Sequence, residues 1–192
     1  MRIVALDFET TGVSPGHPNE PWQLGLVEVD LSMGVVSGTA REWFFRIPRD
    51  RPFSPRAPGR WAEMRDVLAD SPSFLESWPG IADSLSGAAL VAHNAATERT
   101  VIEKRAPLAR LGPWIDTLRL VRKYWPLLES YALGDLIMLF KLKSQVDSIC
   151  PGRTWHDALY DACAGAVLLA HVAHRLKFDA SQLLVEFGVR PW

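Results

Sequence analysis

Two acidic residues close the first apolar segment of the chain, which reads Ile3-Val4-Ala5-Leu6-Asp7-Phe8-Glu9. Side chains alternate across a β-strand, so this pattern directs Asp7 and Glu9 to one face and Phe8 to the other. Adjacent carboxylates repel each other and are costly to remove from water. A divalent cation resolves that conflict, and oxygen ligands suit Mg²⁺ or Mn²⁺. When the pair is taken alone, a strand end that emerges into solvent is the simpler explanation.

A further acidic residue follows the apolar run Leu90-Val91-Ala92 and the polar pair His93-Asn94. Asn94 is a favourable helix N-cap, and the helix that it begins carries Glu98 in its first turn. An acidic residue there also interacts well with the helix dipole, which is the simpler explanation of Glu98 alone. We interpret His93 as a structural hydrogen-bonding residue and not as a metal ligand.

A histidine and an aspartate stand close together in Trp155-His156-Asp157-Ala158-Leu159-Tyr160-Asp161. A helix is predicted from about residue 157, which places Asp161 about one turn inside it. Both side chains can face one site only if His156 belongs to the loop that enters the helix. A solvated Asp–His pair at a helix N-terminus is again the simpler explanation of this segment alone.

Together, these segments resemble the DEDD superfamily of 3′→5′ exonucleases, specifically its DnaQ-like branch with a catalytic histidine (DEDDh). Proofreading subunits, RNase T and oligoribonuclease belong to this branch. Asp7-Phe8-Glu9-Thr10-Thr11-Gly12 matches the first motif, and His93-Asn94-Ala95 matches the start of the second. His156, followed five residues later by Asp161, matches the third motif. Asp116-Thr117-Leu118 matches a segment that recurs between the second and third motifs.

The second motif departs from the family pattern at Glu98, where family members normally carry Asp, and at Thr97, where an aromatic residue is usual. Glu keeps the negative charge but moves the carboxylate outward by one methylene, on the order of 1.5 Å. The tyrosine branch of the superfamily places Tyr four residues before the last Asp. This sequence has Asp157 there, so the histidine branch is the better match.

The resemblance implies hydrolysis of terminal phosphodiesters of single-stranded DNA or RNA from the 3′ end, with release of nucleoside 5′-monophosphates. It implies two Mg²⁺ or Mn²⁺ ions held by Asp7, Glu9, Glu98 and Asp161, with His156 as general base. An imidazole with a pKa of about 6.5 suits proton transfer near neutral pH. Residues of the first two motifs would bind the terminal nucleotide: Phe8, Thr10, Thr11, Gly12 and Asn94. The two threonines fit a tight turn equally well.

The elements that must position these residues follow from the apolar runs and the turn residues between them. Strands are predicted at residues 2–9, 22–30, 41–47, 88–92 and 114–116. Helices are predicted at residues 73–86 with a bend or break at Pro79, from about 95 to before Pro107, and at 117–124, 132–140, 157–175 and 180–187.

The order of these elements predicts the fold class. A meander of three strands followed by strand–helix–strand crossovers gives an α/β fold with a mixed five-stranded sheet flanked by helices. The resemblance makes this fold ribonuclease H-like. We expect one exonuclease domain over residues 1–192. The resemblance spans about residues 1–172, and residues 173–192 form a helical extension at the C-terminus.

Composition sets limits on the partners. The chain has 192 residues, of which 48% are apolar and 22% charged, which fits one globular domain. The formal net charge of −1 excludes a broad basic field for coating nucleic acid, so contacts with a single-stranded 3′ end should be local.

Cys150 and Cys163 lack metal-binding spacing, and we expect free thiols. Without a signal peptide or membrane helix, we expect a soluble cytoplasmic protein, either a homodimer, a polymerase partner or freestanding.

Five arginines lie in or next to a predicted loop over residues 48–59. Arg46, Arg49, Arg51, Arg56 and Arg60 fall within fifteen residues, interleaved with prolines and aromatic residues. They could clamp a single strand through phosphate contacts and stacking. We favour the alternative, a solvated loop whose arginines balance an acidic surface. We interpret Gln23, in the second strand, as a structural hydrogen-bonding residue.

Three functional hypotheses remain open at the level of sequence. The first is an active exonuclease. The second is a nucleic-acid-binding module with weakened catalysis, for which Glu98 is the supporting feature. The third is a phosphodiesterase that acts on dinucleotides. The choice between DNA and RNA depends on pocket contacts to a 2′-hydroxyl, which spacing does not reveal.

Overall fold

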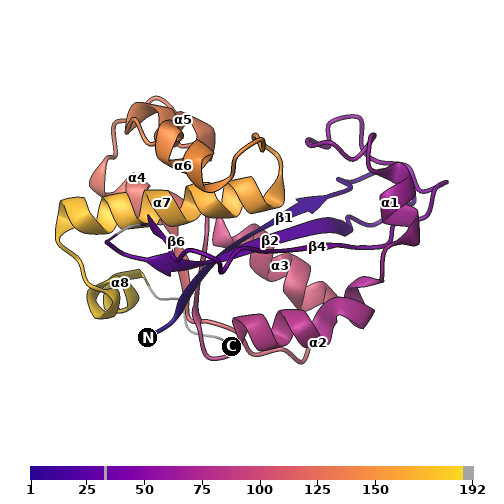
Figure 1. The fold of residues 1–192 in the computed structure, drawn as a ribbon, viewed down its shortest axis with the longest axis horizontal. Coiled ribbons are helices and arrows are strands. Elements are labelled where there is room, and N and C mark those ends of the chain that lie inside the picture. Colours follow the sequence, from indigo (N-terminus) through magenta and orange to yellow (C-terminus); the bar gives the residue numbers. More distant parts are fainter. Residues whose placement is uncertain (33, 188–192) are drawn as a thin grey trace.

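The computed structural model describes residues 1–32 and 34–187, and a mixed sheet lies at its centre with helices on both faces (Figure 1). The sheet has the order β3-β2-β1-β5-β6, and β4 also pairs with β2. The strands are β1 (Ile3–Thr10), β2 (Pro21–Asp30), β3 (Gly34–Val35), β4 (Arg41–Phe44), β5 (Ala89–Ala92) and β6 (Trp114–Asp116). The mixed sheet is therefore confirmed. It has one strand more than the five predicted, because the two residues of β3 are too few to form a periodic pattern.

The central strand β1 has partners of different lengths on its two edges. It pairs antiparallel with β2 from Val4 to Thr10. It pairs parallel with β5 only over Ile3–Ala5, and β5 then ends at Ala92. The last part of β1, which carries Asp7 and Glu9, therefore has one edge without a strand partner. This open edge is where the start of the helix after β5 approaches.

Most of the helices were predicted close to their observed bounds. The helices are α1 (Arg65–Asp70), α2 (Phe74–Leu85), α3 (Ala95–Arg105), α4 (Thr117–Tyr124), α5 (Leu133–Leu139), α6 (Lys143–Ile149), α7 (Ala158–Leu176) and α8 (Ala180–Phe187). The short helices α1 and α6 were not predicted. The expected C-terminal extension contains the end of α7 and all of α8, and residues 188–192 lie outside the described residues.

Helix α2 is continuous across Pro79, so the expected interruption is absent. Ser73 and Glu76 form a reciprocal capping box at its N-terminus. Phe74, Ile81 and Leu85 are buried along one side. Cap and burial together outweigh the single backbone hydrogen bond that a proline removes.

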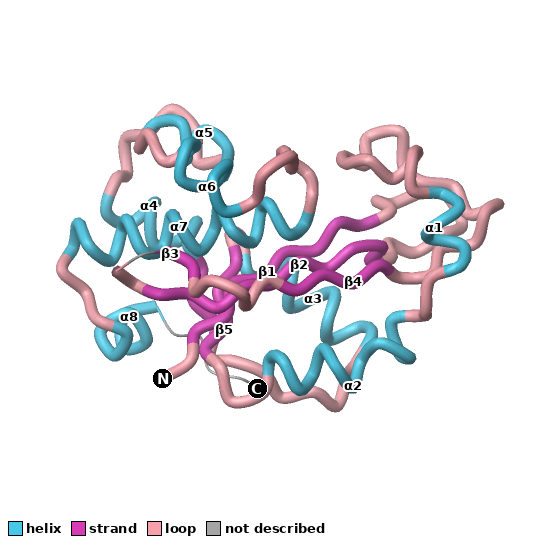
Figure 2. Tube along the Cα trace, viewed as in Figure 1, coloured by secondary structure: helices cyan, strands magenta, loops and turns pink. Residues whose placement is uncertain are grey.

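Helices lie on both faces of the sheet (Figure 2), and an apolar layer on each face holds them there. The long helix α7 packs on one face, where its buried residues join those of β1, β2 and β5. Helices α2 and α3 contribute to the layer on the other face. Cys150 and Cys163 are buried free thiols, as expected. No helix within residues 1–32 and 34–187 is long and apolar enough to cross a membrane.

Candidate active site

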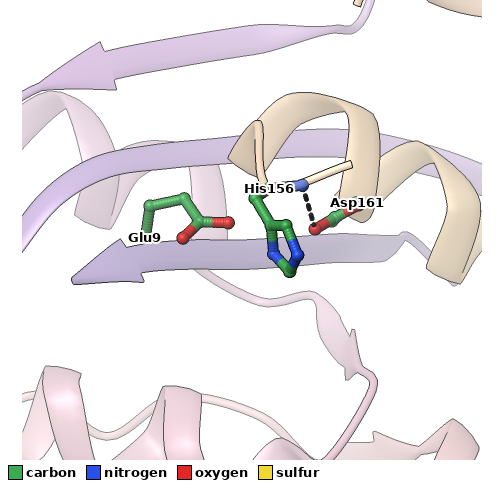
Figure 3. Close-up of side chains that lie close together, drawn as sticks. All are labelled: Glu9, His156 and Asp161. Carbon is green, nitrogen blue, oxygen red and sulfur yellow. Dashed lines mark hydrogen bonds between the residues drawn. The ribbon is translucent and has the colours of Figure 1, made fainter. Parts of the chain in front are cut away.

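The C-terminal end of β1 and the start of α7 bring three of the predicted site residues together (Figure 3). Glu9 comes from β1, Asp161 from the first turn of α7, and His156 from the loop before that helix. One possible ligand atom from each of these three side chains lies within 4.8 Å of the other two. The requirement that His156 belong to the entering loop is met, because α7 begins at Ala158 with Asp157 as its N-cap.

Asp7 joins the same group through its electrostatic environment. Its pKa is raised well above the usual value, first by removal from water and then by the negative charges of Glu98, Asp161 and Glu9. Strand alternation places Asp7 and Glu9 on one face, as the sequence predicted. The four predicted metal ligands therefore share one electrostatic environment.

Glu98 reaches this site from the first turn of α3, and its side chain is buried with only 4% exposure. It accepts a backbone hydrogen bond from Phe8 of β1. That amide is available because β5 pairs with β1 only as far as Ala5. The longer side chain at this position thus contacts the central strand directly, at the edge where the sheet pairing has stopped.

Burial makes the carboxylates of the site costly to ionise. Removal from water is the largest cause that raises the pKa of both Glu9 and Glu98 to about 8, and that of Asp161 to about 7. Among the described residues, Oε2 of Glu98 and Oδ1 of Asp161 are buried without a hydrogen-bond partner. Buried carboxylate oxygens without a partner fit a divalent cation that prefers oxygen ligands.

His156 is exposed and is fixed through its backbone. Its φ of 64° lies in the left-handed region, and its backbone N–H donates to Oδ2 of Asp161 at 3.1 Å. A Cβ on Gly59 would lie only 2.8 Å from the His156 carbonyl oxygen, so the loop that contains Gly59 passes close to the backbone of His156. Figure 3 shows the imidazole between the side chains of Glu9 and Asp161.

Two of the predicted nucleotide-binding side chains are unavailable to a ligand. The ring of Phe8 is buried on the opposite face of β1, where it packs against Phe45 and Phe74. The side chain of Thr11 is fully buried, and its hydroxyl donates to the carbonyl of Gly12 and accepts from the amide of Glu20. Any contact of these two residues with a nucleotide therefore has to come through their backbone, and their part in binding stays a prediction.

The remaining predicted nucleotide-binding residues are at least partly exposed to solvent. Thr10 and Gly12 are partly exposed, and Asn94 is exposed. Gly12 has a φ of 67°, and a Cβ there would lie 2.6 Å from that of Ser54. A glycine is therefore required at this turn for structural reasons alone. The involvement of these residues in binding stays a prediction.

Asn94 does not cap α3 with its side chain, contrary to expectation. Its φ is 71°, and its amide group donates to Oγ1 of Thr97 at 2.9 Å. The carboxylate of Asp116 instead accepts from the backbone amides of Asn94 at 3.1 Å and Ala95 at 3.2 Å. Asp116 lies opposite Ala92 in the β5–β6 pair, a long-range relation that the spacing near Asn94 cannot reveal.

His93 has the structural role that the sequence predicted. Its Nδ1 lies 2.9 Å from Oγ1 of Thr117, and its Nε2 lies 2.8 Å from the carbonyl oxygen of Tyr131. Burial lowers the pKa of its ring. Gln23 is also structural, since it bonds to Glu42 and to the backbone of Ala158.

Most arginines around the loop over residues 48–59 are paired with acidic residues. The side chain of Arg51 is 6% exposed and forms an ion pair with Glu20 at 2.9 Å, and it also donates to the carbonyl of Pro18. Arg51 therefore supports the loop and is not free to bind a phosphate. Other arginines of this region form the surface pairs Arg46–Glu76, Arg49–Asp66, Arg49–Asp70 and Arg60–Glu63.

The sequence of this chain is similar to those of known exonucleases. A family model described as an exonuclease (RNase_T) matches residues 4–169. Exodeoxyribonuclease 10 of Escherichia coli (strain K12) is 31% identical over 184 residues, which cover 95% of this chain and 73% of that protein.

Solved structures share the fold of this chain. Exonuclease X in complex with 5′ overhanging duplex DNA aligns with a TM-score of 0.67 and 30% identity, over 95% of this chain and 96% of that one. The nuclease domain of 3′hExo, a DEDDh family member bound to rAMP, aligns with a TM-score of 0.69 over 98% and 96% of the two chains. At 15% identity, this second likeness shows a shared fold.

Proposed function

Since the chain belongs to the RNase T family of exonucleases, which hydrolyse phosphodiester bonds, we propose that it removes nucleoside 5′-monophosphates from the 3′ end of single-stranded DNA. The observation that carries this proposal is the meeting of Glu9, Asp161 and His156 within 4.8 Å, beside Asp7. A group of carboxylates beside an exposed imidazole suits phosphodiester hydrolysis, where negative charge must be balanced and water activated.

The carboxylates would hold two divalent ions, Mg²⁺ or Mn²⁺. Asp7 would be shared, Glu9 and Asp161 would complete one ion site, and Glu98 would serve the other. Bound ions of this kind balance the charge of the phosphate and lower the pKa of water. The two buried carboxylate oxygens without partners, on Glu98 and Asp161, support this assignment.

His156 would act as the general base. It is exposed, its backbone is held by Asp161, and an imidazole can accept a proton near neutral pH. Thr10 and Gly12, which follow Glu9 closely in the chain, and Asn94, at the start of the helix that carries Glu98, would contact the terminal nucleotide.

DNA is the preferred substrate in this proposal because of the relatives. Exodeoxyribonuclease 10 is named for action on DNA, and the Exonuclease X structure contains duplex DNA. RNA, dinucleotides, and binding without turnover are the alternatives that an assay must separate.

The test is an assay of single-stranded DNA, RNA and dinucleotides, each with Mg²⁺ or Mn²⁺, using strands labelled at either end. Removal of nucleotides from the 3′ end should give an immediate labelled mononucleotide from 3′-labelled DNA and a ladder from 5′-labelled DNA. Asp7→Asn, which keeps the side-chain shape, should reduce this activity to background while the protein stays folded. Full turnover by Asp7→Asn, or binding of DNA by the wild-type protein without any hydrolysis, would refute the proposal.

A further inference from the structure

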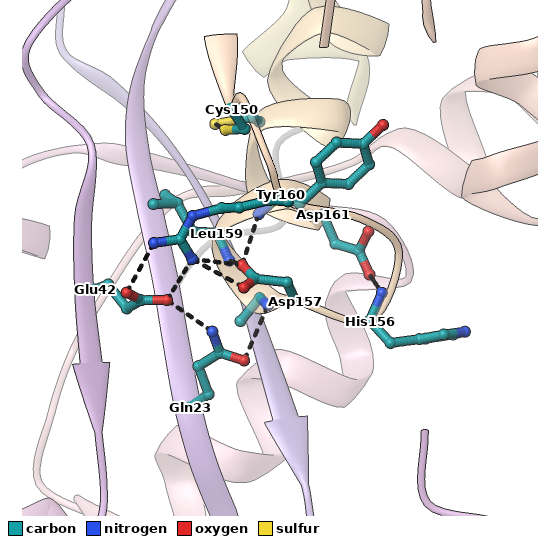
Figure 4. Close-up of polar contacts among 11 residues, drawn as sticks. Gln23, Glu42, Cys150, His156, Asp157, Leu159, Tyr160 and Asp161 are labelled. Carbon is teal, nitrogen blue, oxygen red and sulfur yellow. Dashed lines mark hydrogen bonds and ion pairs between the residues drawn. The ribbon is translucent and has the colours of Figure 1, made fainter. Parts of the chain in front are cut away.

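An ion-paired network lies beside the start of α7, next to the proposed catalytic residues (Figure 4). The figure shows Gln23, Glu42 and Asp157 on one side of the first turn of this helix, and His156 and Asp161 on the other. The residues of the network come from separate elements: β2, β4, and the loop between α6 and α7. None of them belongs to the set of proposed metal ligands or to the proposed base.

Arg153 is the cation of this network. Its Nη1 and Nη2 donate to the two carboxylate oxygens of Glu42 at 2.6 and 3.0 Å. Nη1 also donates to Oδ1 and Oδ2 of Asp157 at 2.8 and 2.9 Å. The three side chains are only 31%, 19% and 18% exposed. Charge-assisted bonds in such a shielded place are stronger and more directional than those of a surface pair.

The network holds the backbone of the first turn of α7. Oδ1 of Asp157 accepts from the amides of Leu159 at 3.1 Å and Tyr160 at 3.2 Å. Gln23 accepts from the amide of Ala158 at 3.2 Å through Oε1, and its Nε2 donates to Glu42 at 2.7 Å. The first three amides of the helix, which have no partner inside it, are therefore all bound to this network.

The same turn is also pressed against the sheet. Gly25 of β2 has no side chain, and a Cβ there would lie 2.2 Å from the backbone nitrogen of Leu159. The helix can approach this closely only at a glycine. Contact with Gly25 fixes how near α7 lies to β2, and the bonds to Gln23 and Asp157 fix the position of the turn along the sheet.

The catalytic geometry depends on this turn because His156 and Asp161 lie at its two ends. The imidazole of His156 has no hydrogen-bond partner among the residues described, so the backbone alone fixes where this side chain leaves the chain. That backbone has a φ of 64°, which costs energy for a residue with a side chain, and is held by the bond to Asp161. A small displacement of Asp157 would therefore move both ends of the His156–Asp161 pair.

We propose that Arg153 is a positioning residue: by joining Glu42 of β4 to Asp157 at the start of α7, it fixes the backbone that presents His156 and Asp161 to the reaction. This inference rests on the proposed exonuclease function. Arg153 touches neither a proposed metal ligand nor the base. It acts on the turnover number through the turn and leaves the contacts with the nucleotide unchanged.

The experiment compares Arg153→Ala with Arg49→Ala, which removes an arginine that also pairs with two carboxylates, Asp66 and Asp70, on another part of the surface. Supporting partners of catalytic ligands typically contribute about 10- to 100-fold in activity. We expect kcat of Arg153→Ala to fall within that range while KM changes by less than about twofold, as for a residue that orients the reacting groups. Arg49→Ala should leave both constants unchanged.

Chemical rescue separates positioning from general stability. A cavity of about 270 Å³ is lined by Gln23, Glu42, Arg153 and His156, among others, and gives a small cation access to the network. Added methylguanidinium should therefore raise kcat of Arg153→Ala several-fold and should not affect Arg49→Ala. Arg153→Lys keeps the charge but cannot donate to both carboxylates in one plane, so we expect a loss of kcat of at least about fivefold.

Amide hydrogen exchange gives a readout that does not need catalysis. The amides of residues 158–160 should exchange at least about tenfold faster in Arg153→Ala and Arg153→Lys than in the wild-type protein and Arg49→Ala. Wild-type exchange in both Arg153 variants, or wild-type kcat in a folded Arg153 variant, overturns the inference. An inactive wild-type protein whose Arg153 variants still show the faster exchange would count against the proposed function alone.

Discussion

The carboxylates of the site are held together at a cost in stability. Glu9, Glu98 and Asp161 all have raised pKa values, and removal from water is the first cause in each case. Asp7 experiences the charges of all three. Under the proposed function, a bound cation would remove this cost by balancing the charges of the carboxylates.

This arrangement predicts how stability depends on pH without metal. Glu9 and Glu98 keep their protons up to a pKa of about 8 when folded, but only to about 4.3 in an unfolded chain. Between these values the folded state binds more protons, so the cluster's contribution to the free energy of unfolding falls as pH rises. Asp7→Asn removes one of the charges. In chelator at pH 8 we expect it to raise Tm by about 4–8 °C, which corresponds to ~2 kcal/mol.

The measurement is a set of melting curves from pH 5 to pH 8. The difference in Tm between Asp7→Asn and the wild-type protein should grow with pH and should disappear when Mn²⁺ is added at pH 8. A difference that stays constant over this range would show that the cluster is not under electrostatic strain.

Glu98 has two roles that a pair of variants can separate. Its carboxylate accepts a backbone hydrogen bond from Phe8 and carries the charge proposed for metal binding. Glu98→Gln can keep the hydrogen bond but loses the charge, so we expect an unchanged or higher Tm and a loss of activity of about 100-fold. Glu98→Asp keeps the charge, and we expect activity within about tenfold of wild type. Glu103→Gln, on an exposed part of the same helix, serves as the control, and equal losses in both Glu98 variants would contradict this assignment.

The sequence predicts the helices and strands that depend on a local pattern of residues. The apolar periodicity located the five longer strands and most helices, and the family resemblance named acidic residues that the structure brings into one electrostatic environment. The sequence could not reveal relations between distant segments. It missed the capping of α3 by Asp116 and the burial of Arg51 beside Glu20. It also did not show that the side chains of Phe8 and Thr11 are buried, because a motif records which residues recur and not which way they point.

Asp116 joins two helices in a way that leads to a stability prediction. Its carboxylate accepts from the amides of Leu118 at 2.9 Å and Arg119 at 3.3 Å at the start of α4, in addition to the amides at the start of α3. One helix cap contributes roughly 0.5–2 kcal/mol, so Asp116→Ala should lower the free energy of unfolding by about 1–4 kcal/mol. Denaturant unfolding measures this difference. Asp135→Ala, which replaces an exposed aspartate in the first turn of α5, should stay within about 0.5 kcal/mol of wild type, and an equal loss in both variants would rule out a double cap.

For the whole molecule, charge balance limits how a nucleic acid can be bound. The net charge is −1, and Arg46, Arg49, Arg51 and Arg60 are engaged in ion pairs with acidic residues. Most of the arginines that could form a broad clamp are therefore already paired with acidic residues of the protein. Arg56 is different, because it is exposed and forms no ion pair within the part of the chain that the structure describes. If this loop contacts the strand, Arg56 is the residue through which it does so.

The variant Arg56→Ser tests this contact through the salt dependence of KM. Each phosphate contact on a single strand contributes a slope of about −0.7 to the logarithm of affinity against the logarithm of salt concentration. If Arg56 makes one such contact, its loss should raise KM several-fold at low salt and flatten the salt dependence by about that amount, with kcat and Tm unchanged. Arg51→Ser should instead lower Tm, since it breaks a buried ion pair with Glu20. A KM and salt slope that are unaffected in Arg56→Ser would remove the loop over residues 48–59 from the substrate path and leave binding to the predicted nucleotide-binding residues.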